Sequence, residues 1–133
     1  MSETLRDRVL LLSGGVDSAV ILAMHRRQLF SCIFVDYRQP AAHEEYRAAR
    51  ALCEHYRMAL TRVSTELPLG GTMDAGVGAV GARVVPARNA VLLSLAVGFA
   101  AHHQCKIVEF GATASDVAEY PDCRPAFVGA FNA

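Results

Sequence analysis

The sequence has no tryptophan, no Cys-x-x-Cys pair, no excess of either charge and no long apolar segment. Its four cysteines therefore suggest neither a disulfide framework nor a zinc knuckle. Lys plus Arg and Asp plus Glu number 13 each, so no basic field favours nucleic acid or a membrane surface. The longest uncharged apolar stretch covers residues 90–101, whereas a bilayer span needs about 20 residues. Charges near the N-terminus replace the apolar core of a signal peptide, so we expect a cytoplasmic protein.

The size and composition favour a folded domain. The chain has 133 residues, of which 53% are hydrophobic and 20% are charged, which excludes disorder driven by charge. A chain of this length can bury a core of its own. We therefore expect a single domain over residues 1–133.

Short apolar runs alternate with helical periodicities along the chain. The apolar runs predict strands at residues 8–12, 32–37, 59–63 and 106–110. Helical spacing predicts helices at 16–30, 43–57 and 88–103, and in the first of these the apolar residues at helical spacing are Val16, Val20, Ile21 and Met24. Loops are expected at 69–82 and 111–123, and the start of a helix at 124–131. The alternation predicts an α/β fold, a Rossmann-like doubly wound and mostly parallel sheet with helices on both faces.

In such sheets a ligand binds beyond the carboxyl ends of the strands. That rule selects four places, namely Ser13–Ser18, Asp36–Gln39, Gly111–Asp116 and the loop before Arg88. The first, with the sequence SGGVDS, lies between a predicted strand and a predicted helix. Glycines allow a sharp turn, and the helix N-terminus favours an anion. An ordinary strand–helix turn is the alternative, and Asp17 is suited either to capping the helix or to holding Mg²⁺ near phosphates.

The segment SGGVDS resembles the PP-loop, with the signature SGGxDS, of the ATP pyrophosphatases. Three further segments resemble one branch of that superfamily, the 7-cyano-7-deazaguanine synthases of queuosine biosynthesis. Residues 35–39 (VDYRQ), followed by His43 and Glu44, are similar to the family's VDYGQ…H..E, and residues 85–89 (VPARN) to its VPGRN. Residues 111–127, which contain YPDCRP, are similar to its G…D…YPDCRP.F stretch. The resemblance extends from about Val9 to Asn132.

The resemblance implies an adenine nucleotide α-hydrolase-like fold and an ATP-dependent ligase with a small-molecule substrate. The enzyme would convert 7-carboxy-7-deazaguanine and ammonia to the nitrile through an adenylated intermediate, with ATP and Mg²⁺. The expected catalytic residues are Asp17, Ser18 and Arg88. The expected nucleotide-binding residues are Leu12, Ser13, Gly14, Gly15, Val16, Asp17, Ser18, Asp36 and Tyr37. The expected substrate-binding residues are Arg88, Asn89, Asp116, Tyr120, Asp122 and Arg124.

Several of these residues also have simpler interpretations. The guanidinium of Arg88 suits phosphate or carboxylate oxygens, but it is also compatible with a surface arginine in a first helical turn. Asp116 could read a purine-like ring or belong to a plain loop, and Asp122 and Arg124 could pair with each other. Cys123 has no adjacent histidine, which favours a buried thiol over a nucleophile.

The sequence also departs from the family pattern. Arg38 and Ala87 replace the glycines of VDYGQ and VPGRN. Family members continue into a C-terminal portion with a four-cysteine zinc site, whose ligands are absent here, so we expect no metal ligands and no stoichiometric zinc. We expect a homo-oligomer or a completing partner chain. The alternatives are a truncated non-catalytic nucleotide-binding module, a subunit completed by a partner, or another PP-loop ligase or thiolase.

Overall fold

The computed structural model describes residues 5–67, 88–111 and 132. Four parallel strands form one sheet in the order β3-β2-β1-β4. In chain order the elements are β1 (Arg8–Leu11), α1 (Val16–His25), β2 (Leu29–Asp36), α2 (Ala42–His55), β3 (Leu60–Ser64), α4 (Arg88–His102) and β4 (Ile107–Glu109). The strand order reverses at β1, because β2 and β3 follow on one side and β4 on the other.

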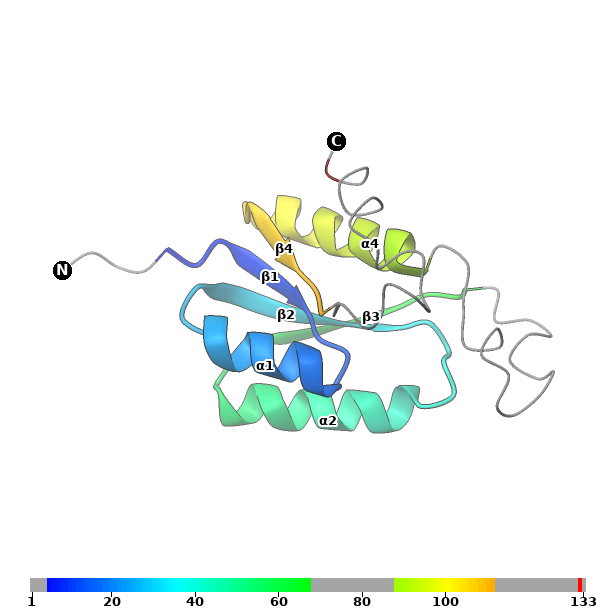
Figure 1. Ribbon diagram of the computed structural model, residues 1–133. Coiled ribbons are helices and arrows are strands. Elements are labelled where there is room, and N and C mark those ends of the chain that lie inside the picture. Colours follow the sequence, from blue (N-terminus) through cyan, green and yellow to red (C-terminus); the bar gives the residue numbers. More distant parts are fainter. Residues whose placement is uncertain (1–4, 68–87, 112–131, 133) are drawn as a thin grey trace.

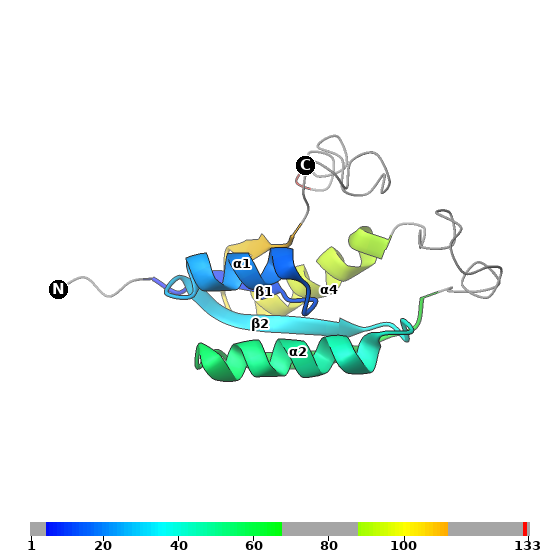
Figure 2. The same cartoon turned by 60° about the horizontal axis from the view of Figure 1, so that its bottom comes forward.

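The helices form a layer on each side of this sheet. Figure 1 shows α1 and α2 together on one side and α4 on the other. Figure 2 shows α2 running along the length of β2. The predicted α/β class, with a doubly wound parallel sheet, is confirmed. In the part of the chain that the structure describes, no helix is long and apolar enough to cross a membrane.

The alternating side chains of β1 supply both layers of the core. Leu10 and the residue that follows the strand, Leu12, are fully buried against α1 and α2, with Leu22 among their neighbours. Val9 points the other way, into a smaller cluster with Ala96 of α4. Burial of each large apolar side chain stabilises the fold by about 1.5–3 kcal/mol. The buried central strand thus keeps the end of β1 in a fixed position.

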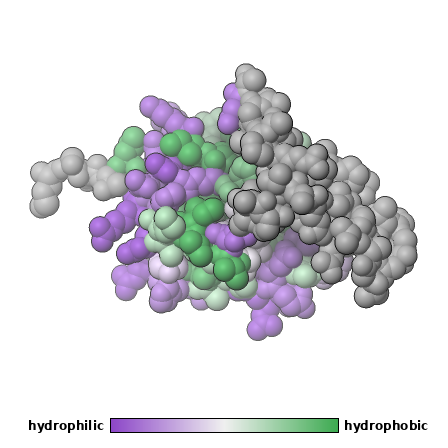
Figure 3. Space-filling model, viewed as in Figure 1, coloured by the Kyte–Doolittle hydropathy of each residue, from purple (hydrophilic) through white to green (hydrophobic). Residues whose placement is uncertain are grey.

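The first predicted helix differs from the observed one in length. Helix α1 ends at His25, because residues 26–28 form a turn and β2 begins at Leu29 rather than at residue 32. Ser18 and Leu22 face the core, whereas Val16, Val20 and Met24 are exposed. Figure 3 shows apolar surface on the side of the molecule that carries α1. The periodicity predicted the helix, but apolar residues lie on both of its sides, since Ile21 packs against the core, so the spacing alone did not identify the buried side. The other described elements match their predicted positions within about three residues, and the predictions for 69–82, 112–123 and 124–131 lie outside the described residues.

Candidate functional site

The loop between β1 and α1 is organised by its own serine side chains. The buried Ser18 hydroxyl accepts the Ser13 N–H (3.2 Å) and donates to the Gly15 carbonyl (3.3 Å). It also lies 3.2 Å from the Ser13 hydroxyl, which accepts the Gly15 N–H (3.3 Å). These bonds hold the backbone in a tight arc around the N-terminus of α1.

Two glycines let neighbouring segments pass close to this loop. Gly14 has φ +81°, in the left-handed region, and a Cβ there would fall on the carbonyl oxygen of Glu45 in α2. At the exit of β4, a Cβ on Gly111 would lie 3.1 Å from the Cβ of Asp17 and 3.2 Å from the Ser18 nitrogen. The β1–α1 loop is therefore held between α2 and the end of β4. For Gly14, the approach of the protein's own backbone is a sufficient reason for glycine.

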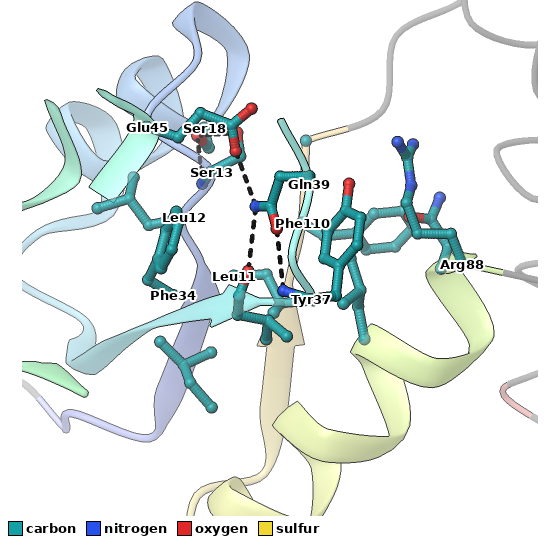
Figure 4. Close-up of a pocket in the computed structure, with 15 residues that line it drawn as sticks. Leu11, Leu12, Ser13, Ser18, Phe34, Tyr37, Gln39, Glu45, Arg88 and Phe110 are labelled. Atoms are coloured by element: carbon teal, nitrogen blue, oxygen red, sulfur yellow. Dashed lines mark hydrogen bonds between the residues drawn. The ribbon is translucent and has the colours of Figure 1, made fainter. Parts of the chain in front are cut away.

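A cavity of about 240 Å³ opens at the carboxyl ends of β1, β2 and β4, where the strand order reverses (Figure 4). Apolar side chains of β1 and β2 line its inner part, and polar groups from the loop, α2 and the start of α4 line the rest. This is the position at which open α/β sheets bind ligands. Its lining residues are Leu11, Leu12, Ser13, Ser18, Ile33, Phe34, Val35, Tyr37, Gln39, Glu45, Arg88, Asn89, Leu92, Phe110 and Gly111.

The expected site residues fall into three groups. Those that line the cavity are Leu12, Ser13, Ser18, Tyr37, Arg88 and Asn89. A second group lies near the cavity without lining it, namely Gly14, Gly15, Val16, Asp17 and Asp36. The expected residues Asp116, Tyr120, Asp122 and Arg124 lie outside the described residues.

The family model described as "Queuosine biosynthesis protein QueC" matches residues 7–133 of this chain. The chain belongs to the QueC family. Curated relatives named 7-cyano-7-deazaguanine synthase include those of Nitrosomonas eutropha (38% identity over 96% of this chain and 62% of the relative) and Nitrosococcus oceani (38%, 93% and 61%). The relative from Stenotrophomonas maltophilia is 37% identical over 97% of this chain and 63% of its own length. The chain thus spans about three fifths of the length of these relatives.

The fold also occurs in a solved structure of lower sequence similarity. The NH3-dependent NAD synthetase from Campylobacter jejuni superposes with a TM-score of 0.51 and 20% identity, over 81% of this chain and 48% of that one. At this identity the likeness concerns the fold alone. The α/β fold of this chain is therefore shared with that protein.

Asp36 ends β2, but its carboxylate faces β3 rather than the cavity. It accepts a hydrogen bond from Arg62 (2.6 Å) and another from the Arg38 N–H (2.9 Å). The Arg62 guanidinium and the Arg38 N–H lower the pKa of Asp36 below its usual range. Among the described residues, the Asp36 carboxylate therefore links β2 to β3 through Arg62. The sequence had suggested that Asp36 binds the nucleotide.

We expect Arg62→Ala to destabilise the fold at neutral pH by less than about 1 kcal/mol, since solvent screens this partly exposed pair. A carboxylate with a lowered pKa contributes stability above its ordinary value, near pH 4, and loses it as the pH falls. The difference from wild type should therefore shrink as the pH falls below about 4. Urea unfolding at pH 7, 4 and 2.5 measures this, with the exposed Arg50→Ala as control. A difference that is as large at pH 2.5 as at pH 7 would assign the effect to the stacking of Arg62 on Tyr46 (4.7 Å).

Arg38 adopts the backbone conformation that favours glycine. Its φ is +64°, at the position where the family motif has glycine. The side chain costs about 1–2 kcal/mol in that conformation, and its guanidinium pairs with Glu66 (3.0 Å) at the surface. The other two non-glycine residues with positive φ in the described part, Arg57 and Gln104, follow helices, where this conformation is common. The turn after β2 thus has a left-handed residue here although that residue is not glycine.

Two polar residues of the cavity, Gln39 and Glu45, were not among the expected site residues, although Gln39 belongs to the selected segment Asp36–Gln39. The buried Gln39 side chain accepts the Tyr37 N–H (2.9 Å) and donates to the Glu45 carboxylate (3.0 Å) and the Val35 carbonyl (3.4 Å). Figure 4 shows this amide between the loop and Tyr37. Gln39 is part of the segment VDYRQ that resembles the family motif, so the sequence contained the information needed to predict it. Glu45 could not be identified as a site residue from the sequence, because the residue that matched the family motif was its neighbour Glu44, which is exposed.

The oxygen donors of the cavity fit a hard cation better than zinc. Within residues 5–67 and 88–111, no group of three or more His, Cys, Asp or Glu side chains could hold a metal ion. Mg²⁺ needs no such group, because it is usually bound by one or two carboxylates together with substrate phosphates. A carboxylate and two hydroxyls in the cavity match that donor set. The thiols of Cys32 and Cys53 are buried in the core, away from the cavity, and the contact with the Cys53 thiol, together with burial, raises the pKa of Cys32.

Proposed function

We propose that this chain carries the ATP-binding and activating part of an ATP-dependent ligase that makes 7-cyano-7-deazaguanine from the carboxylic acid and ammonia. The observation that carries the proposal is that the β1–α1 loop and Arg88 line one and the same cavity at the reversal of the strand order. Membership of the QueC family and the names of the curated relatives support this substrate class.

The N-terminus of α1 supplies the site for phosphates. The first backbone bond of the helix joins the Ala19 N–H to the Gly15 carbonyl (3.1 Å), so the preceding N–H groups have no partner inside the helix. Together with the helix dipole they favour an anion, here the pyrophosphate part of ATP. The Ser13 and Ser18 hydroxyl groups, which order the loop, line the cavity wall beside these N–H groups. Mg²⁺ bound with the nucleotide would neutralise charge on the departing pyrophosphate.

Arg88 and the apolar inner wall position the reacting groups. Arg88 opens α4 at the cavity rim, where its planar guanidinium can hold phosphate or carboxylate oxygens. Phe34 and Phe110 offer apolar surface to a flat heterocycle. The protein acts here by positioning and charge stabilisation, and the scheme needs no protein nucleophile.

The reaction balances with two molecules of ATP. The substrate carboxylate attacks the α-phosphorus, so that pyrophosphate leaves and an acyl adenylate forms. Ammonia then bonds to the acyl carbon, AMP leaves and one proton is released, which gives the amide. The amide oxygen is adenylated by the second ATP in the same way. Loss of AMP and of the remaining amide protons gives the nitrile.

The test is an assay of the purified chain with ATP, Mg²⁺, ammonium and 7-carboxy-7-deazaguanine. We expect AMP and pyrophosphate to form only when the acid is present, and the nitrile to appear by mass spectrometry only when ammonium is present. Thermal stabilisation by ATP without AMP formation would instead support a non-catalytic module or a subunit that needs a partner. AMP formation with other carboxylic acids only would support another PP-loop ligase.

We further propose that the reaction takes place in the cytoplasm on a small molecule, without nucleic acid or membrane. The balanced charge of the chain supports this, because no basic field attracts polyanions. We also propose that the working form is a homo-oligomer or includes a completing partner chain. Sedimentation velocity distinguishes such a form from a 14.3 kDa monomer.

A further inference from the structure

Glu45 brings a carboxylate into the cavity beside the β1–α1 loop. It lies in the first turn of α2, half-buried, and it lines the same cavity as Ser13 and Ser18. Figure 4 shows its carboxylate close to these two serines. The preceding residue, Glu44, has the same chemistry but is exposed and does not line the cavity.

The contacts of Glu45 hold its carboxylate in place without neutralising it. One oxygen accepts the Gln39 amide (3.0 Å), and Gln39 is itself fixed by the Tyr37 N–H and the Val35 carbonyl. Glu45 forms no ion pair with any other described residue. The carboxylate is thus oriented by a neutral amide, and its negative charge can attract a bound cation.

A carboxylate in a cavity that binds phosphates needs a cation between the two negative groups. Without one, Glu45 would repel the pyrophosphate that the N-terminus of α1 attracts. Mg²⁺ resolves this conflict, because it takes hard oxygen ligands and bridges a protein carboxylate to nucleotide phosphates. Asp17 was the sequence-based candidate for this role, but it does not line the cavity.

We infer that Glu45, oriented by Gln39, is the carboxylate that holds the Mg²⁺ of Mg²⁺·ATP in this cavity. The inference rests on the proposed function, since it requires ATP at the β1–α1 loop. It assigns Gln39 as a positioning residue that fixes the carboxylate.

The experiment compares Glu45→Gln with Glu44→Gln and with Glu54→Gln, an exposed glutamate on the same helix. ATP affinity is measured by calorimetry with Mg²⁺ and with EDTA, and metal binding by the Mn²⁺ signal in electron paramagnetic resonance. We expect Mg²⁺ to strengthen ATP binding at least tenfold in wild type and in both control variants. Glu45→Gln should lose that gain and the bound Mn²⁺ signal, and should bind metal-free ATP as well as wild type or better. Glu45→Asp should retain part of the gain.

Several results would overturn the inference. Glu45→Gln could keep the full effect of Mg²⁺, or it could weaken ATP binding equally with and without metal, which would indicate a structural role. Loss of the Mg²⁺ effect in Glu44→Gln would assign the metal to the motif residue instead. A response of wild type to ammonium but not to Mg²⁺, lost in Glu45→Gln, would make the site one for the nitrogen donor. If wild type binds no ATP under either condition, the proposed function itself fails.

Discussion

Gly14→Ala is expected to abolish ATP binding and to destabilise the fold by about 2–4 kcal/mol. Two physical reasons act together. Gly14 has a left-handed φ of +81°, which an alanine adopts only with strain, and the added Cβ would fall on the backbone carbonyl of Glu45. Because a backbone carbonyl cannot rotate away as a side chain would, either the loop or the first turn of α2 must move. Urea unfolding and the ATP-dependent shift in melting temperature measure the two effects.

The matched control is Gly98→Ala. Gly98 lies within α4, and a Cβ there would meet nothing within 4 Å. Alanine in a helix interior is favoured over glycine, so this variant should be more stable than wild type by about 0.5–1 kcal/mol and bind ATP normally. Wild-type nucleotide affinity in Gly14→Ala would show that the loop is not the phosphate site.

Arg88→Ala is expected to lower the kcat/KM for AMP formation by about 10²–10³-fold, the usual cost of removing a group that stabilises developing charge. Arg88 opens α4 at the cavity rim, close to Tyr37 in Figure 4. A cation at a helix N-terminus is unfavourable for stability, so the free energy of unfolding should change by less than about 1 kcal/mol. Activity and stability would thus respond differently. Arg88→Lys should restore activity only in part, since lysine cannot form the planar two-point contact.

Arg50→Ala provides the comparison for Arg88→Ala. Arg50 is exposed on α2 and pairs with Glu54 at 3.6 Å, away from the cavity. This variant should keep kcat/KM within about twofold of wild type, because exposed ion pairs contribute little. Equal losses in the two variants would indicate a general effect of positive charge and would contradict a specific role for Arg88.

Much of the fold followed from local patterns. The apolar runs of β1 and β2 and the periodicity of α4 were readable because each element carries its signal within a few neighbouring residues. The alternation of these elements then predicted the parallel sheet. The face of α1 was not readable, because Val16, Val20 and Met24 repeat at helical spacing as regularly as a buried stripe would. Only packing against β1 and β2 selected Ser18 and Leu22 as the inner side.

The sequence by itself determined the family and the loop. The segments 13–18, 35–39 and 85–89 are short and contiguous, so their resemblance needs no knowledge of contacts, and the match over residues 7–133 confirms the family. Tertiary structure alone decided which polar groups share the cavity. It turned Asp36 toward Arg62 and brought Glu45 from a different element to the β1–α1 loop. The physical reason is that side-chain direction at a strand end or in a helix turn depends on neighbours distant in the chain, and no local pattern records them.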